Sequence, residues 1–100
     1  MNIDLSKFIG TWQLDPTDDA GKQAYGDVTL RFGADKSLLY ITHQHDRDEI
    51  ARLTFRIEPG FIITDQPSAP RSERTAYEFT EDVKLILILK GEKSRYIRVK

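Results

Sequence analysis

The chain has 100 residues, 39% of them hydrophobic and 31% charged, a composition typical of one soluble globular domain spanning residues 1–100. The 15 Lys and Arg side chains nearly balance the 16 Asp and Glu side chains, and the net charge of -1 gives no reason to expect nucleic acid or an anionic membrane as a partner. The absence of cysteine excludes disulfides, thiolate metal sites and cysteine nucleophiles.

The distribution of apolar residues gives no membrane-spanning segment. The longest unbroken apolar run is Leu85 to Leu89, whereas a membrane span needs about 20 residues. The first residues, Met1 to Asp4, form neither a basic leader nor an apolar signal core. We therefore expect a cytoplasmic protein, the alternative being a protein whose export signal has been removed.

Alternating apolar and polar residues predict β-strands along most of the chain, with turn residues between them. A first strand at 11–15 and a second at 25–32 flank the polar stretch 17–22, which is expected to be a loop. Further strands are expected at 37–44, 51–58, 61–66, 73–80, 84–90 and 93–99.

The short connections between these segments indicate how the strands pair. Most connecting turns have about two to six residues, which favours a meander of antiparallel hairpins. A sheet of short strands removes its exposed edges most simply by closing on itself. The chain is therefore expected to be an all-β, antiparallel, up-and-down β-barrel of about eight short strands, with a short helical turn at the N-terminus.

The start of the first strand carries a motif. The tripeptide Gly10-Thr11-Trp12 contains the single tryptophan of the chain and follows an expected helical turn around 4–8. Together with a basic residue in the last strand, this pattern resembles the lipocalin-like, or calycin, superfamily, in particular its short bacterial-type members. The resemblance implies that Trp12 plugs one end of the barrel and that a ligand binds at the opposite, open end.

The same resemblance implies that an arginine of the last strand packs across the Trp12 ring. Strand parity is used to choose that arginine. Because Ile97 and Val99 are apolar, their face is taken as the inward one, and Arg95 shares it. The pair expected to close the barrel is therefore Trp12 and Arg95, in a cation–π contact.

The stretch 64–74 displays the densest set of binding groups in the chain. Two prolines stiffen it, and loops on a rigid β scaffold are common places for binding sites. Arg71 and Arg74 suit a carboxylate or a phosphate. The alternative is that they form ion pairs with Asp65 and Glu73 and hold the loop in place.

Parity gives Asp65 the same face as Phe61 and Ile63, so its carboxylate is expected to point into the barrel. A buried carboxylate needs a partner, and the candidates are Arg74, Tyr77 and Arg95. The expected ligand-binding residues are Asp65, Arg71, Arg74, Tyr77, Tyr40 and Phe55, and Phe32 and Phe79 are expected to complete the walls.

The function these residues favour is binding of a small anionic or amphipathic ligand at the open end of a lipocalin-like barrel. The alternative is an interaction module with a filled core and no ligand. Ile86 and Ile88 are apolar on the face opposite Leu85, Leu87 and Leu89, and a strand with two apolar faces needs cover on both. That alternative predicts a homodimer through Ile86 and Ile88.

Residue patterns for catalysis or metal binding are weak. His43 and His45 lie two residues apart and are followed by Asp46, Asp48 and Glu49, which is compatible with a metal site, but a solvated hairpin tip is the favoured interpretation. An enzyme using Asp65 or His43 as general base lacks a second identifiable catalytic group. Neither a Gly-rich phosphate loop nor a nucleophile elbow is present, so no cofactor is expected.

Overall fold

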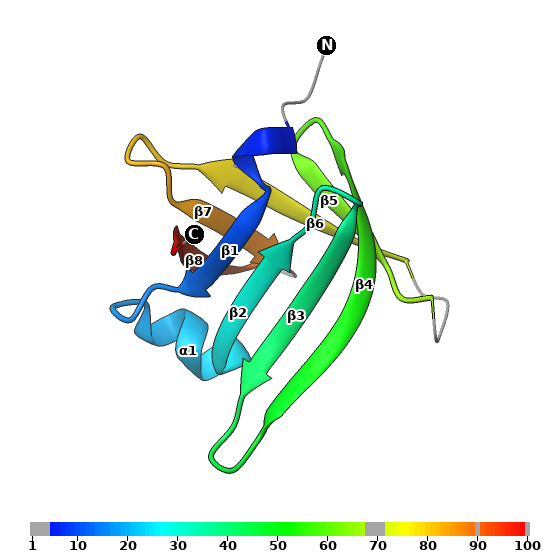
Figure 1. Ribbon diagram of the computed structural model, residues 1–100. Helices are drawn as coiled ribbons and strands as arrows, with labels where there is room; N and C mark the ends of the chain where they lie inside the picture. Colours follow the sequence, from blue (N-terminus) through cyan, green and yellow to red (C-terminus); the bar gives the residue numbers. More distant parts are fainter. Residues whose placement is uncertain (1–4, 68–71, 90, 100) are drawn as a thin grey trace.

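The computed structural model describes residues 5–67, 72–89 and 91–99. Its eight strands form one closed antiparallel barrel in which each strand pairs with the next and the last pairs with the first (Figure 1), which confirms the predicted all-β architecture. The elements are η1 (Leu5–Lys7), β1 (Gly10–Leu14), α1 (Asp19–Tyr25), β2 (Asp27–Phe32), β3 (Ser37–His43), β4 (Asp48–Glu58), β5 (Phe61–Asp65), β6 (Ser72–Phe79), β7 (Leu85–Leu89) and β8 (Glu92–Arg98).

Period-two alternation builds the interior of the barrel. In β2 the side chains of Val28, Leu30 and Phe32 are buried, as the sequence predicts. The register places Leu30 opposite Tyr40 of β3, so their side chains share the inner face. The core cluster consists of Phe8, Trp12, Leu14, Val28, Leu30, Phe32, Leu38, Phe55, Ile62, Leu85 and Tyr96.

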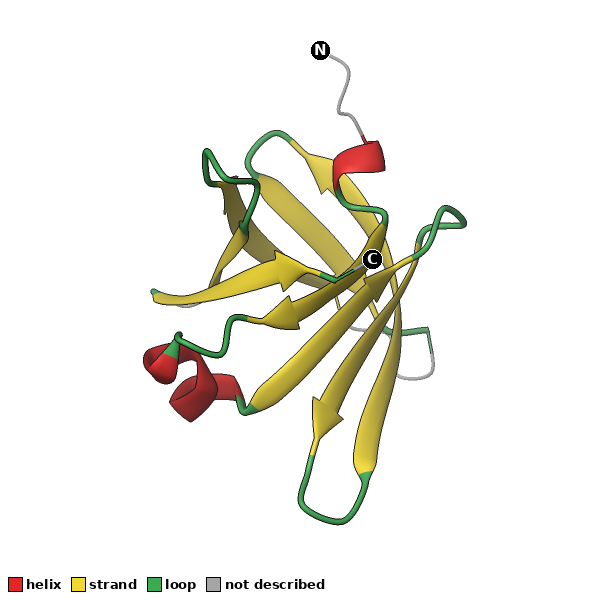
Figure 2. Ribbon diagram, turned by 60° about the vertical axis from the view of Figure 1, so that its left-hand side comes forward, coloured by secondary structure: helices red, strands yellow, loops and turns green. Residues whose placement is uncertain are grey.

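One end of the barrel is closed by η1 and the residues that follow it, while α1 lies at the other end (Figure 2). Trp12 is 0% exposed, and its indole Nε1 donates a hydrogen bond of 2.9 Å to the Phe8 carbonyl oxygen. The Phe8 ring meets Tyr77 and Phe79 edge-on, with centroids 5.0 and 5.1 Å away. Such T-shaped pairs fill the end of the barrel with close-packed aromatic surface.

The arginine that packs over Trp12 is Arg98, so the prediction of Arg95 is wrong. The Arg98 guanidinium carbon lies 4.7 Å from the Trp12 ring centroid, and Arg98 also donates to the carbonyl oxygens of Ile9, at 3.1 Å, and Lys7. The register explains the error, because Arg98 lies directly opposite Trp12 across the β1–β8 ladder and shares its inward face.

The opposite parity of β8 follows from the residues that are buried. Ser94 and Tyr96 are 3% and 1% exposed, so they and Arg98 face inward, whereas Arg95 faces outward. Val99, contrary to the prediction that it faces inward, is 46% exposed. Tyrosine and arginine have apolar bodies with polar ends, so Tyr96 and Arg98 can face the interior. The prediction used only the aliphatic residues Ile97 and Val99 and therefore assigned the wrong face of β8 to the interior.

The stretch 17–22, predicted to be a loop, contains the start of helix α1, and the second strand begins at Asp27 instead of residue 25. The Asp18 carboxylate caps the helix by accepting a 3.0 Å hydrogen bond from the Gly21 amide. Gly26, with φ of 80°, ends the helix in a conformation that favours glycine.

A second contact of Asp18 fastens α1 to the barrel. Its other carboxylate oxygen accepts a 2.8 Å hydrogen bond from the Arg95 amide of β8. A Cβ atom on Gly21 would lie 2.5 Å from this oxygen, so a larger residue there would displace the Asp18 carboxylate from this position. A helix of seven residues is too short to be stable alone, and this tertiary contact helps to hold it across the open end.

Candidate functional site

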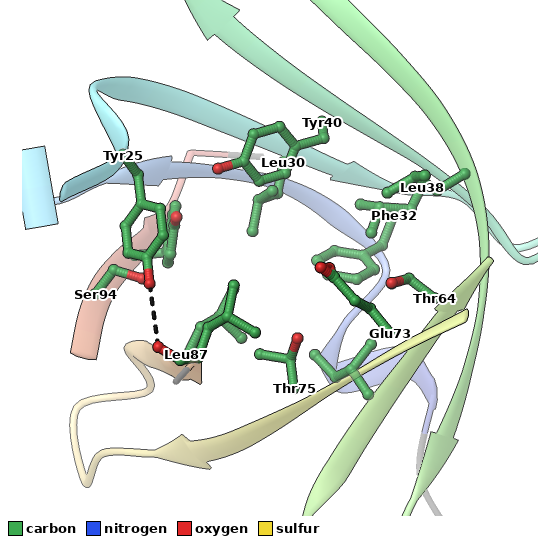
Figure 3. A pocket seen from close by; sticks show the side chains of 14 residues that line it. Tyr25, Leu30, Phe32, Leu38, Tyr40, Thr64, Glu73, Thr75, Leu87 and Ser94 are labelled. Atoms are coloured by element: carbon green, nitrogen blue, oxygen red, sulfur yellow. Dashed lines mark hydrogen bonds between the residues drawn. The ribbon is translucent and has the colours of Figure 1, made fainter. Parts of the chain in front are cut away.

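The barrel encloses a cavity of about 110 Å³ (Figure 3). Tyr25 of α1 and Ser94 at the start of β8 belong to its walls, whereas Trp12 and Phe8 do not. The position at the end opposite Trp12 is the one at which a ligand was expected. The aliphatic surface of the cavity comes from Leu30, Leu38, Leu53, Ile62, Leu87 and Leu89, and its aromatic and polar surface from Tyr25, Phe32, Tyr40, Thr64, Glu73, Thr75, Ser94 and Tyr96.

Three tyrosines bring hydroxyl groups to this cavity from α1, β3 and β8. The Tyr25 hydroxyl donates to the Leu89 carbonyl oxygen at 3.4 Å (Figure 3). Burial raises the pKa of Tyr25, Tyr40 and Tyr96 above the usual value of 10.0, most strongly for Tyr96. These phenols therefore stay neutral at neutral pH and serve as hydrogen-bonding groups, not as bases.

Glu73 of β6 is the charged residue among the described residues that line the cavity. It lies opposite Thr64 in the β5–β6 ladder, and Figure 3 shows its side chain pointing into the cavity. In the sequence, Glu73 was predicted as an ion-pair partner of a loop arginine and not as a wall residue. The signal was available, because Glu73 shares period-two parity with Thr75, which also lines the cavity.

The prediction that Asp65 points into the barrel is wrong. Asp65 is exposed, and Ile62 and Thr64 are the β5 residues that line the cavity. The parity of β5 is ambiguous from sequence because Ile62 and Ile63 are 2% and 7% exposed, so both faces of the strand are apolar. Pairing with β4 and β6 determines which of the two faces turns inward.

Arg74 lies on the outer face of the barrel, away from the cavity. Its guanidinium carbon stacks 3.8 Å from the Phe61 ring centroid. In the sheet, Ile63 lies between Arg56 and Arg74 on neighbouring strands, where the aliphatic parts of arginine side chains suit an apolar neighbour. Arg71 lies outside the described residues.

The expected aromatic wall residues divide between the cavity and the closed end. Tyr40 and Phe32 line the cavity, as predicted. Phe55 packs edge-on against Phe32 at 5.0 Å, and Tyr77 contacts Phe8 and Phe79 beneath η1. Of the six expected ligand-binding residues, the structure thus places Tyr40 in the wall of the cavity.

Arg95 belongs to an ion-pair cluster on the outside of β8. Its Nε lies 2.9 Å from Asp15, which also receives hydrogen bonds from the Thr17 amide and hydroxyl, and Lys84 Nζ lies 3.6 Å away. The Thr17 hydrogen bonds and the Arg95 guanidinium hold the pKa of the Asp15 carboxyl well below its usual range. This cluster links the β1–α1 connection to β8 and β7.

His43 lies on the outer face of the β3–β4 hairpin. Its Nε2 is 2.7 Å from the Thr29 hydroxyl, and its Nδ1 is 2.9 Å from Asp48. The order hydroxyl, imidazole, carboxylate matches that of a nucleophile, a base and an orienting acid, but none of the three residues lines the cavity. Within residues 5–67, 72–89 and 91–99, no three His, Asp or Glu side chains come together as a metal site.

The outer face of β7 carries Ile86 and Ile88, as parity predicts. Ile88 lies between Ala76 and Lys93 on the neighbouring strands, and Ile86 lies beside Arg95. Both isoleucines are half-buried by these neighbours. Homodimerisation through this face stays a prediction, which a measurement of the solution mass by light scattering tests, since a strict monomer at high protein concentration would contradict it.

In comparisons with known proteins, no family model, curated protein or solved structure matches this chain. Among the described helices, none has the length and apolar character needed to cross a membrane.

Proposed function

We propose that this chain is a small lipocalin-like barrel that binds a small amphipathic molecule in the cavity at the end opposite Trp12. The observation that carries the proposal is the cavity itself, with an aliphatic surface and a few converging polar groups. This combination is the usual composition of a small-molecule site, in which apolar walls supply affinity and polar groups fix orientation. The plug formed by Trp12 and Arg98 agrees with what the calycin resemblance implies for the opposite end.

The volume limits the size of the ligand. The cavity of about 110 Å³ is smaller than the roughly 300–1,000 Å³ typical of sites for drug-sized molecules. An apolar cavity of about 150 Å³ is large enough for benzene. Since the cavity in this barrel is smaller still, the part of the ligand that enters is at most the size of one aromatic ring or a short alkyl chain, with its polar group among the hydroxyl and carboxylate groups of the wall.

The lining does not favour the anionic ligand that was expected from the sequence. Of the two arginines predicted for the site, Arg74 stacks on Phe61 outside the barrel, and Arg71 lies outside the described residues. The charged wall residue, Glu73, is negative. An anion would therefore lose hydration and meet a like charge, so the proposal is confined to amphipathic ligands that are neutral or cationic.

NMR titration of the isotopically labelled chain with 2-phenylethanol tests the proposal. Saturable shifts are expected for the methyl groups of Leu30, Leu53 and Leu87 in the wall, while Ile50, which is 52% exposed on the outer surface, stays unchanged. Shifts confined to outer residues, or shifts that never saturate, would contradict the proposal.

A cavity-filling variant provides the second test. Thr75→Phe puts a ring into the cavity that Thr75 lines and is expected to weaken 2-phenylethanol binding at least about tenfold, because the added ring occupies the ligand volume. The matched control is Thr54→Phe on the exposed side of β4, which is expected to leave binding unchanged. Equal binding by both variants would place the ligand elsewhere.

A further inference from the structure

Glu73 is directed into the barrel by the strand that carries it. Its neighbours on the inner face are Thr64, directly across the β5–β6 ladder, and Thr75, two residues along β6. The residue is half-buried, and its side chain extends into the cavity (Figure 3). A carboxylate loses hydration in such a place and is stabilised by any positive charge that enters.

The described part of the protein supplies no such positive charge. Across residues 5–67, 72–89 and 91–99, no hydrogen bond or ion pair reaches the Glu73 carboxylate. Its chain neighbour Arg74 faces the opposite side of the sheet and stacks on Phe61. The remaining polar wall groups are neutral hydroxyls, so Glu73 sets the sign of the charge inside the cavity.

From this arrangement we infer that the cavity selects organic cations, in which an ammonium or amidinium group pairs with Glu73 and an apolar body fills the rest of the space. This inference rests on the proposed function, since it names the class of ligand for the same cavity. The carboxylate accepts charge-assisted hydrogen bonds from the ligand N–H groups. Phe32 and Tyr40 line the same cavity, and aromatic rings of this kind attract cations.

The polar and apolar surfaces of the cavity fit the two ends of such a ligand. Thr64 and Thr75 flank Glu73 and offer hydroxyl oxygens that accept further N–H hydrogen bonds. The aliphatic side chains of Leu30 and Leu87 supply surface for the apolar body. With about 110 Å³ available, a short alkylamine fits, and an arylalkylamine with one ring is the upper limit of size.

Three ligands of nearly equal shape separate charge from size, namely 2-phenylethylamine, 2-phenylethanol and phenylacetate. At pH 7 they carry a positive, a zero and a negative charge. The full chain is expected to bind the amine roughly two- to fivefold more tightly than the alcohol, the range for one partly exposed ion pair, and to bind the acid most weakly. Raising the salt concentration should weaken binding of the amine and leave binding of the alcohol unchanged.

Glu73→Gln tests the assigned residue, since it keeps the shape of the side chain and removes its charge. The amine is expected to bind the variant no more tightly than the alcohol does, while the affinity for the alcohol stays within about twofold. The matched control is Glu78→Gln, which removes the same charge from an exposed position on the same strand and should preserve the preference for the amine.

The outcomes distinguish this inference from the proposed function. If the unmodified chain binds amine, alcohol and acid equally, or if it prefers the acid, charge selection is refuted and the cavity remains a ligand site. If none of the three shifts the wall methyl resonances, both fail. If Glu78→Gln abolishes the preference as fully as Glu73→Gln does, a general surface charge is responsible and the assignment to Glu73 is wrong. The comparison of ligands on the unmodified chain needs no variant, so it holds even if Glu73→Gln fails to fold.

Discussion

Replacement of Trp12 by alanine is expected to remove much of the stability of the barrel. Trp12 is 0% exposed and packs beside Phe79, with ring centroids 6.1 Å apart. Truncating a fully buried tryptophan costs about 3–5 kcal/mol, since the surrounding side chains only partly fill the space. The substitution also removes the hydrogen bond from the indole Nε1 to the Phe8 carbonyl oxygen and the ring on which Arg98 stacks. Against a total stability of about 5–15 kcal/mol for a small domain, this loss leaves the fold marginal.

The conservative variant Trp12→Phe separates the hydrogen bond from the packing. Phenylalanine keeps a ring in the plug but has no N–H for the Phe8 carbonyl oxygen, which accepts from Trp12 at 2.9 Å. An unsatisfied buried acceptor costs about 1–3 kcal/mol. The expected order of stability is therefore the unmodified chain, then Trp12→Phe, then Trp12→Ala.

Urea unfolding followed by far-ultraviolet circular dichroism measures these losses without relying on the fluorescence of the residue that is removed. For a domain of this size, a loss of 3 kcal/mol corresponds to a decrease in melting temperature of about 12 °C or more. The matched control is Val99→Ala, at a residue that is 46% exposed, for which a change within about 0.5 kcal/mol is expected. If Trp12→Ala cost less than about 1 kcal/mol, Trp12 would not be the residue that closes the barrel.

Two further changes test the contacts that hold the open end. Gly21→Ala places a Cβ 2.5 Å from the Asp18 carboxylate, so it should destabilise the chain by about 1–3 kcal/mol and lower its melting temperature. An unchanged melting temperature would show that Asp18 moves away without loss of stability. Because the pKa of Asp15 is lowered in the folded state, its stabilising effect is fully present above its usual value of 3.8 and is lost as the pH falls from there through the folded pKa. The free energy of unfolding, measured between about pH 5 and pH 2, should thus fall more steeply as the pH decreases. Asp15→Asn should remove part of this pH dependence. An identical pH profile in the variant would refute the assignment to Asp15.

The barrel itself follows from patterns that are local in the sequence. In β2, Val28, Leu30 and Phe32 alternate with polar residues, and a strand of that kind has one possible buried face. The turn at Pro59-Gly60 and the short hairpins around it restrict each strand to pairing with its sequence neighbours. Eight such segments on a meander have few ways to bury their apolar faces, and closure is one of them.

The residues of the candidate site were harder to predict than the fold. They depend on which face of each strand turns inward, and in some strands both faces are apolar. The β5 residues Ile62 and Ile63 are both buried, so a shift of one residue exchanges Asp65 for Thr64 on the inner face. A choice of this kind is made by hydrogen bonding to both neighbouring strands. The sequence therefore indicated that β5 contributes to the site, but not with which side chain.

Helix α1 shows the same dependence on distant partners. Asp18 and Gly26 are recognisable signals for its beginning and end, but seven residues do not form a stable helix alone. The hydrogen bond from the Arg95 amide to Asp18 joins residues far apart in the chain, and it exists only once β8 has closed the barrel. Its absence from local sequence explains why this stretch was predicted to be a loop.

The alternation of apolar and polar residues by itself predicted an all-β barrel, and the resemblance to lipocalin-like proteins implied that Trp12 lies in its plug beneath an arginine of the last strand. Only the tertiary structure decided that the arginine is Arg98, that Arg95 pairs with Asp15 outside, and that Thr64 rather than Asp65 faces the cavity. The physical reason is that alternation specifies two faces for each strand, whereas the register of the closed ladder specifies which face is inside.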